Sequence, residues 1–197
     1  IASAAAVELL HNASLIHDDV VDNSAMRRGL PTVNNVWDNH IAVLVGDFFV
    51  SNALQQALST DDIRIVGSLA MLGKLLSLGE IDQIYNARYH KLSEDAYFEV
   101  ISRKTASLFV SCVEIGGYAV GADGEALAAI REYARLLGLC FRSRMTYLII
   151  IMMKLLWVSL PATTCVKVKS LCRCCMPLSI VPAKSVNICV SFHAKSV

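Results

Sequence analysis

Apolar side chains recur every three to four positions through the first 142 residues, which is the spacing of one face of an α-helix. Helix-start residues such as Thr60-Asp61 and Ser93 precede these segments, and Gly121–Gly124 is a break. The β-branched residues do not alternate along the chain as they would in strands. The pattern predicts an all-α bundle. The expected helices are Ala2–Asp22, Asn34–Ser59, Asp62–Tyr89, Ser93–Gly117 and Gly124–Phe141.

Length and charge narrow the class of protein. A chain of 197 residues can bury one substantial core. A net charge of +1 gives no reason to expect a nucleic-acid partner. No secretory signal precedes the first helix, and the apolar run Tyr147–Leu160 is short for a bilayer, so we expect a cytoplasmic protein without a membrane span. The chain starts at Ile1 without methionine, which suggests a fragment.

The first predicted helix ends in three carboxylates, Asp18, Asp19 and Asp22. Positions i and i+4 place Asp18 and Asp22 one turn apart on a single face, with Asp19 beside them. A solvated acidic surface is one interpretation. The preceding segment Ala4–Ile16 is mostly apolar and small, however, as in a buried helix, so the charges that close it need a function. Mg²⁺ is commonly bound by one or two carboxylates together with substrate phosphates.

Two adjacent arginines, Arg27 and Arg28, begin five residues after Asp22. A guanidinium presents forked donors that match phosphate oxygens. Together the carboxylates and arginines predict a magnesium-diphosphate site.

The segment Glu8–Pro31 resembles the first aspartate-rich region of the trans-isoprenyl diphosphate synthases, also called polyprenyl synthases. The resemblance covers residues 1–141 and continues in Gly46-Asp47, Gly79–Gln83, Lys104-Thr105 and Leu136–Phe141. It implies a helical bundle around a central cavity, a homodimer, and a prenyltransferase reaction. In that reaction an allylic diphosphate ionises and the double bond of isopentenyl diphosphate attacks the cation.

The resemblance also implies roles for the acidic segment. Asp18 and Asp22 are expected to be the main Mg²⁺ ligands, and Asp19 is expected to assist them. Arg27 is expected to hold the allylic diphosphate and Arg28 the isopentenyl diphosphate.

Further roles are expected outside that segment. Lys104 and Thr105 are expected to reach the allylic diphosphate. His11 is expected near the homoallylic site, although a core histidine is the simpler alternative. Asp82 and Gln83 either face the cavity or make interhelical hydrogen bonds, and both readings stay open.

Two more positions bear on structure and product. Asp47 is expected to be a structural partner, and His17 is expected to point away from the carboxylates. Ser14 and Ala13, four and five positions before Asp18, lie one turn deeper on the same wall. In relatives that make short products a bulky aromatic closes the pocket there, so small residues predict a medium or long all-trans polyprenyl product.

The chain changes character after Phe141. No Asp or Glu follows Glu132, and five of the seven cysteines lie between Cys165 and Cys189. At face value this segment could be a membrane anchor, a metal-binding tail or a disulfide-rich extension. No paired Cys-x-x-Cys spacing supports a zinc site.

The genetic code offers a better account of this segment. When each codon is read from its last base, Met145-Thr146 must give Asp, Met152-Met153 must give Asp, and Trp157-Val158 must give Gly. Permitted codons elsewhere restore Gln-Ile-Lys-Asp-Asp-Ile-Phe-Asp, which resembles the second aspartate-rich motif of the family. We infer a one-base frame change near Cys140-Phe141.

The frame change predicts a catalytic segment at 1–142 and a tail at 143–197 that was not selected for structure. Without the second carboxylate cluster, this chain is expected to have little activity. A non-catalytic damaged or regulatory subunit is therefore an alternative. A terpene cyclase is another, but it binds no second diphosphate, so Arg27-Arg28 and Lys104-Thr105 favour chain elongation.

Overall fold

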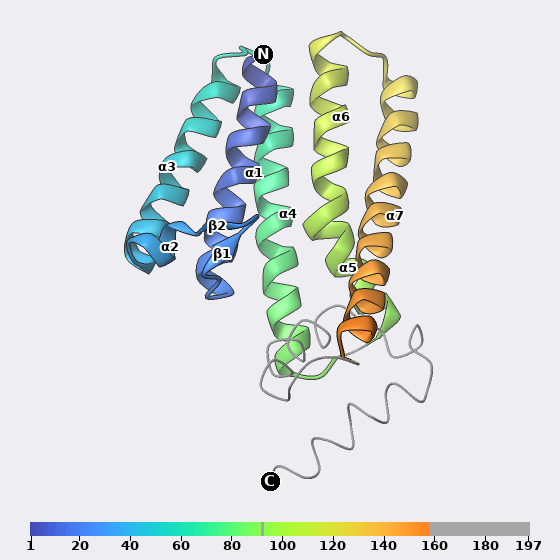
Figure 1. Cartoon of the computed structure of the whole chain (residues 1–197). Helices are drawn as coiled ribbons and strands as arrows, with labels where there is room; N and C mark the ends of the chain where they lie inside the picture. Colours follow the sequence, from blue (N-terminus) through green and yellow to red (C-terminus); the bar gives the residue numbers. More distant parts are fainter. Residues whose placement is uncertain (92, 158–197) are drawn as a thin grey trace. The chain divides into compact units, whose positions relative to one another are not determined.

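A computed structural model describes residues 1–91 and 93–157, and nearly all of this part is helical (Figure 1). The all-α prediction is confirmed. The elements in chain order are α1 (Ala2–Val21), β1 (Met26–Arg27), β2 (Leu30–Pro31), α2 (Val33–Val36), α3 (Asn39–Leu58), α4 (Ile63–Arg88), α5 (Glu94–Ile101), a π-helical turn η1 (Ser102–Ala106), α6 (Ser107–Ala119) and α7 (Gly124–Trp157).

The chain forms two compact units. Of the described residues, the first unit contains Ile1–Leu76 and Ser107–Arg135, and the second contains Ser77–Ala106 and residues 136–157. Helices α4 and α7 contribute to both units. The predicted division after residue 142 stays a prediction, and helix α7 is continuous across that position.

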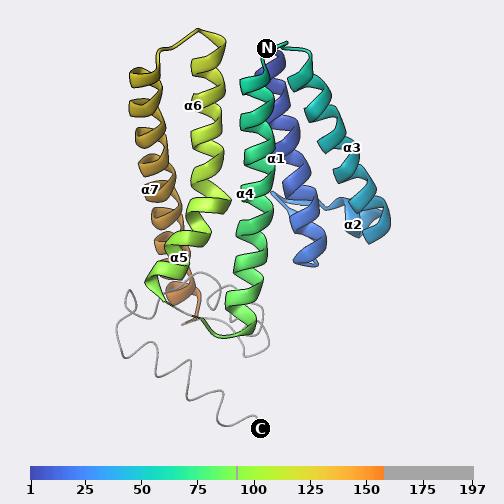
Figure 2. The same ribbon diagram turned by 180° about the vertical axis from the view of Figure 1, so that it is seen from behind.

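The core of the first unit lies between α1, α3, α6 and the first half of α4. Both views show α1 between α3 and α4 (Figures 1 and 2). Alanines supply much of the contact surface of α1 and α3, which lets these helices approach closely, and Leu69 and Leu72 of α4 are its largest fully buried side chains. Burying each leucine contributes about 1.5–3 kcal/mol. The buried cluster is Ala6, Val7, Leu10, Ala53, Ala57, Ile65, Leu69, Leu72 and Ile115.

The helix predicted at Asn34–Ser59 is interrupted. The short helix α2 ends at Val36, and α3 begins at Asn39. The Asp38 side chain causes the restart, because its Oδ1 accepts a hydrogen bond from the Ile41 amide at 2.8 Å and caps a new helix.

The next predicted helices also differ from the structure. Ser93 caps α5 as expected, since its Oγ accepts from the Ala96 amide at 3.1 Å. The π-helical turn η1 then separates α5 from α6 within the segment predicted as one helix. Helix α7 runs beyond the predicted end at Phe141, because no Gly or Pro interrupts residues 142–157.

A close approach between α1 and α3 occurs at Gly46. A Cβ placed on this glycine would lie 2.2 Å from His17 Nε2, so the imidazole occupies the space above the glycine. His17 Nε2 lies 3.2 Å from the Val43 carbonyl oxygen and 3.4 Å from Asp47 Oδ1. His17 therefore contacts α3, and Asp47 is its structural partner, as the sequence indicated.

We predict that Gly46→Ala lowers the free energy of unfolding by about 1–3 kcal/mol, because the methyl group must displace the His17 ring. The matched control is Gly67→Ala in α4, where no heavy atom lies within 4 Å of the added Cβ. The control should gain about 0.5–1 kcal/mol from the helix preference of alanine. Urea unfolding followed by circular dichroism measures both. Equal stabilisation by the two substitutions would contradict the packing described at Gly46.

Candidate active site

The three aspartates predicted to bind metal lie together at the carboxyl end of α1. Asp22 caps this helix and is exposed, Asp18 is half-buried, and Asp19 is buried. The last turn of α1 contains no basic residue. The end of a helix also carries the negative pole of its dipole, so the negative potentials of backbone and side chains add here.

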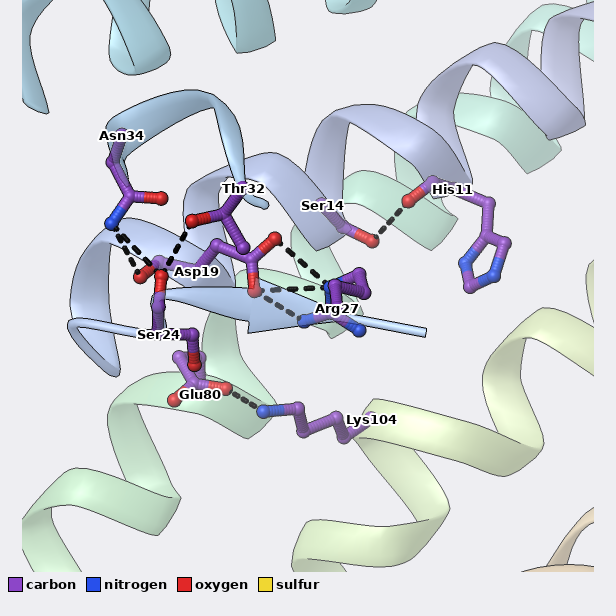
Figure 3. A network of polar contacts seen from close by, with 9 residues as sticks. All are labelled: His11, Ser14, Asp19, Ser24, Arg27, Thr32, Asn34, Glu80 and Lys104. Carbon is purple, nitrogen blue, oxygen red and sulfur yellow. Dashed lines mark hydrogen bonds and ion pairs between the residues drawn. The ribbon is translucent and has the colours of Figure 1, made fainter. Parts of the chain in front are cut away.

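Asp19 forms a forked ion pair with Arg27 (Figure 3). Arg27 Nε donates to Asp19 Oδ1 and Oδ2 at 3.0 and 2.9 Å, and Arg27 Nη2 lies 2.9 Å from Oδ1. The hydrogen bond to Asp19 raises the pKa of Arg27, with further support from the charges of Asp19, Asp18 and Asp22, while partial burial opposes the shift. The arginine is thus charged, and its ion pair with Asp19 fixes its orientation.

A two-residue hairpin carries the arginine pair. Strands β1 and β2 pair antiparallel, with Arg27 opposite Leu30. Arg28 and Gly29 have φ angles of 51° and 81° in the turn between them. Two positive φ values in a two-residue loop are typical of a type I′ turn. The sequence predicted no strands, because a pairing of two residues per strand has no periodicity to detect. Arg28 is exposed at this turn.

Hydrogen bonds fasten the hairpin to the end of α1 (Figure 3). Thr32 Oγ1 donates to the Ser24 carbonyl oxygen at 2.6 Å. Asn34 Nδ2 donates to the carbonyl oxygens of Ser24 and Asp19 at 3.2 and 3.4 Å. Both donors follow β2, so the far end of the hairpin is hydrogen-bonded to the backbone at the end of α1, from which its near end extends.

The predicted wall residues lie deeper on α1. Ala13 is fully buried, and Ser14 is half-buried. Ser14 Oγ donates to the carbonyl oxygen of His11 at 2.7 Å, so its hydroxyl is satisfied within the helix (Figure 3). His11 is half-buried. The roles of these residues in substrate binding and product length stay predictions.

The other predicted substrate residues meet in the second unit. Gln83 of α4 and Lys104 and Thr105 of η1 line one small pocket. Arg142, which lies after the frame change inferred near Cys140-Phe141 and reads as glutamine in the restored frame, also lines it. The remaining lining residues are Tyr97, Val100 and Ile101 of α5. The pocket thus combines an apolar wall with two cationic side chains.

Ion pairs join α4 to η1 beside this pocket. Lys104 Nζ pairs with Glu80, and Arg103 pairs with both Asp82 and Glu99 (Figure 3 shows the Lys104 pair). Of the two alternatives, facing the cavity or making an interhelical contact, each applies to one of the two residues. Asp82 makes an interhelical contact, whereas Gln83 lines the pocket. The pairing of Lys104 with Glu80 was not predicted, because residues 24 positions apart carry no local signal in the sequence.

Within residues 1–91 and 93–157, no three His, Cys, Asp or Glu side chains converge as a ready-made metal site. Asp18 and Asp22 provide two carboxylates, and Asp19 is already paired with Arg27. Two exposed or half-exposed carboxylates fit Mg²⁺, which usually keeps several waters and shares its shell with substrate phosphates. The tail cysteines from Cys165 onward lie outside the described residues.

Comparisons with known proteins agree with these features. The family model for polyprenyl synthetase matches residues 1–145. The octaprenyl diphosphate synthase of Escherichia coli (strain K12) is 36% identical over 139 residues, covering 71% of this chain and 43% of that protein. The all-trans-nonaprenyl-diphosphate synthase (geranyl-diphosphate specific) of Rhodobacter capsulatus is 35% identical over 139 residues, covering 71% of this chain and 42% of that protein.

Solved structures give the same result. A decaprenyl diphosphate synthase from Rhodobacter capsulatus superposes with a TM-score of 0.71 at 38% identity, covering 76% of this chain and 45% of that one. A polyprenyl synthase from Caulobacter crescentus CB15, complexed with calcium and isoprenyl diphosphate, has a TM-score of 0.69 at 38% identity and covers 72% and 43%. The chain spans less than half the length of these relatives. From its matched residues and its fold, the chain belongs to the polyprenyl synthetase family.

Proposed function

We propose that this gene encodes an all-trans polyprenyl diphosphate synthase, a prenyltransferase that joins isopentenyl diphosphate to an allylic diphosphate. The observation that carries the proposal is the grouping of Asp18 and Asp22 with an arginine oriented by Asp19. Such a surface attracts a hard cation and a diphosphate together. The relatives that resemble the chain include synthases of octaprenyl, nonaprenyl and decaprenyl diphosphates as well as geranylgeranyl and short-chain synthases, all of them chain-elongating enzymes. Arg27-Arg28 likewise favours elongation over cyclisation.

Mg²⁺ is the cofactor we propose, held by Asp18 and Asp22 with Asp19 as a weaker contributor. A bound divalent ion supplies charge neutralisation for the departing diphosphate. A homologous polyprenyl synthase has been crystallised with calcium and isoprenyl diphosphate, which supports a hard cation at this class of site.

The arginines would bind the diphosphates. Arg27 directs Nε and one Nη2 donor at Asp19, which leaves its remaining N–H groups for phosphate oxygens. Because Asp19 fixes the guanidinium plane, little side-chain freedom is lost when the substrate binds. Arg28, exposed in the hairpin turn, would take the isopentenyl diphosphate, with His11 nearby. Lys104, Thr105 and Gln83 would contact the allylic diphosphate from their pocket.

Small residues at Ala13 and Ser14 support a medium or long product, since neither side chain can close a cavity as an aromatic ring would. The names of the relatives span both long and short products, from octaprenyl and decaprenyl to geranylgeranyl, so the proposal of a medium or long product rests on Ala13 and Ser14.

We also propose a cytoplasmic homodimer. Helix α3 exposes Leu44, Phe48 and Leu58, each more than 60% accessible, which is a surface suited to a second subunit. Among the described helices, α3 alone is long and apolar enough to cross a membrane, with 22% of its window buried. Length and composition alone fit both a membrane-crossing helix and a helix that contacts a second subunit, and membership of this family favours the subunit contact.

The division of labour among the aspartates is testable in the restored protein, meaning the complete gene product with the frame corrected near Cys140. We predict that Asp18→Asn weakens Mg²⁺-dependent binding of farnesyl diphosphate by at least tenfold, measured by titration calorimetry. Asp19→Asn should instead lower the free energy of unfolding by about 1–3 kcal/mol, because Arg27 loses its charged partner. Unchanged magnesium-dependent binding in the Asp18 variant would refute the assigned ligand.

The frame change gives a separate prediction. The 197-residue chain should show little turnover of labelled isopentenyl diphosphate with farnesyl diphosphate and Mg²⁺, since it lacks the second carboxylate cluster. Restoring Asp-Asp-Ile-Phe-Asp after Cys140 should restore extension of the primer, scored as polyprenyl products by chromatography. Robust turnover by the uncorrected chain would rule out the frame interpretation.

A further inference from the structure

We propose that Glu80 is a positioning residue that holds the Lys104 ammonium at the wall of the pocket lined by Gln83, Lys104 and Thr105. This inference rests on the proposed function, in which Lys104 contacts the allylic diphosphate. All of the residues involved belong to the second unit.

The first support is a backbone contact at Gly79. A Cβ on this buried glycine would lie 3.0 Å from the Lys104 backbone nitrogen and 3.1 Å from Lys104 Cβ. Arg103 Cβ would lie 3.2 Å away. The closest of these atoms is main chain, which cannot rotate aside. Helix α4 therefore packs closely on η1 at Gly79, and any larger residue would require η1 to move by a few tenths of an ångström.

The second support is the placement of the Glu80 carboxylate. One oxygen pairs with Lys104 Nζ, and Gln83 Nε2 donates to the other at 3.4 Å. The side chains of Glu80 and Lys104 are only 13% and 21% exposed, so water screens their attraction weakly. Both carboxylate oxygens thus bind side chains that line the pocket.

The third support is the π-helical turn itself. Consecutive residues of a regular α-helix point about 100° apart. In η1, adjacent Arg103 and Lys104 nevertheless both reach α4, where Arg103 pairs with Asp82 and Lys104 pairs with Glu80. Arg103 also pairs with Glu99 of α5, which ties the turn on its other side. Single π turns are frequent at functional sites.

The consequence is preorganisation. A lysine has a flexible four-carbon stem, and fixing it during ligand binding costs affinity. Glu80 restricts Lys104 before the diphosphate arrives, at the expense of placing a negative charge near the anion. The substitutions Glu80→Gln and Glu80→Ala remove that charge equally, but only glutamine keeps an oxygen that accepts from Nζ. Comparing the two variants therefore isolates positioning from charge.

The contact is tested first in the 197-residue chain by acetylation of lysines, followed by mass spectrometry. Lys104 should react more slowly than exposed Lys74, and Glu80→Ala should speed its reaction severalfold. The matched control is Glu132→Ala, which removes an exposed ion pair with Arg135 and should leave Lys104 reactivity unchanged. Equal Lys104 rates in the native chain and the Glu80→Ala variant would overturn the contact.

The role is tested in the restored protein by steady-state kinetics. Glu80→Ala should raise KM for farnesyl diphosphate on the order of tenfold above that of Glu80→Gln, with KM for isopentenyl diphosphate unchanged. Equal KM values in the two variants would overturn positioning. Lys104→Ala separates the two proposals: if it leaves KM for farnesyl diphosphate unchanged, the substrate role of Lys104 fails, whatever Glu80 does.

Discussion

The accumulation of negative charge at the end of α1 is the constraint on which the site depends. Three carboxylates and the negative pole of the helix meet there, and the helix supplies no cation of its own. Arg27 neutralises part of this charge, because the hairpin places it beside Asp19, with which it forms a forked ion pair. The carboxylates of Asp18 and Asp22 are more accessible than that of Asp19, and a divalent cation would further relieve the repulsion among the three. The same ion pair thus reduces repulsion and orients the guanidinium that we propose binds a diphosphate.

Close packing between helices holds the elements that carry these residues in place. Small residues let α1 and α3 approach, and the His17 ring fills the space over Gly46. In the second unit, Gly79 plays a comparable part where α4 meets η1. Gly46 leaves room for the His17 ring, whereas Gly79 lets α4 approach the backbone of η1, and a charged side chain lies beside each contact. The family signatures Gly46-Asp47 and Gly79-Glu80 each join these two features.

Much of the fold followed from helical periodicity. Helix α1 and helix α4 ended within one residue of the predicted positions, because their apolar faces are long and regular. The helix boundaries that were predicted wrongly have identifiable physical causes. A helix restart at Asp38 looks like a continuing helix when only apolar spacing is considered, and the π turn changes spacing by a single residue. At the site, the aspartates and arginines could be predicted from their spacing along the chain. The pairing of Lys104 with Glu80 was not, since it depends on tertiary placement.

The most direct test of the central claim is a crystal structure of the restored protein with Mn²⁺ and a prenyl diphosphate, using anomalous scattering to locate the metal. We expect an anomalous peak next to the carboxylates of Asp18 and Asp22 and to the diphosphate, with Asp19 still paired to Arg27. A metal bound away from Asp18 and Asp22, with the diphosphate out of reach of Arg27, would contradict this claim.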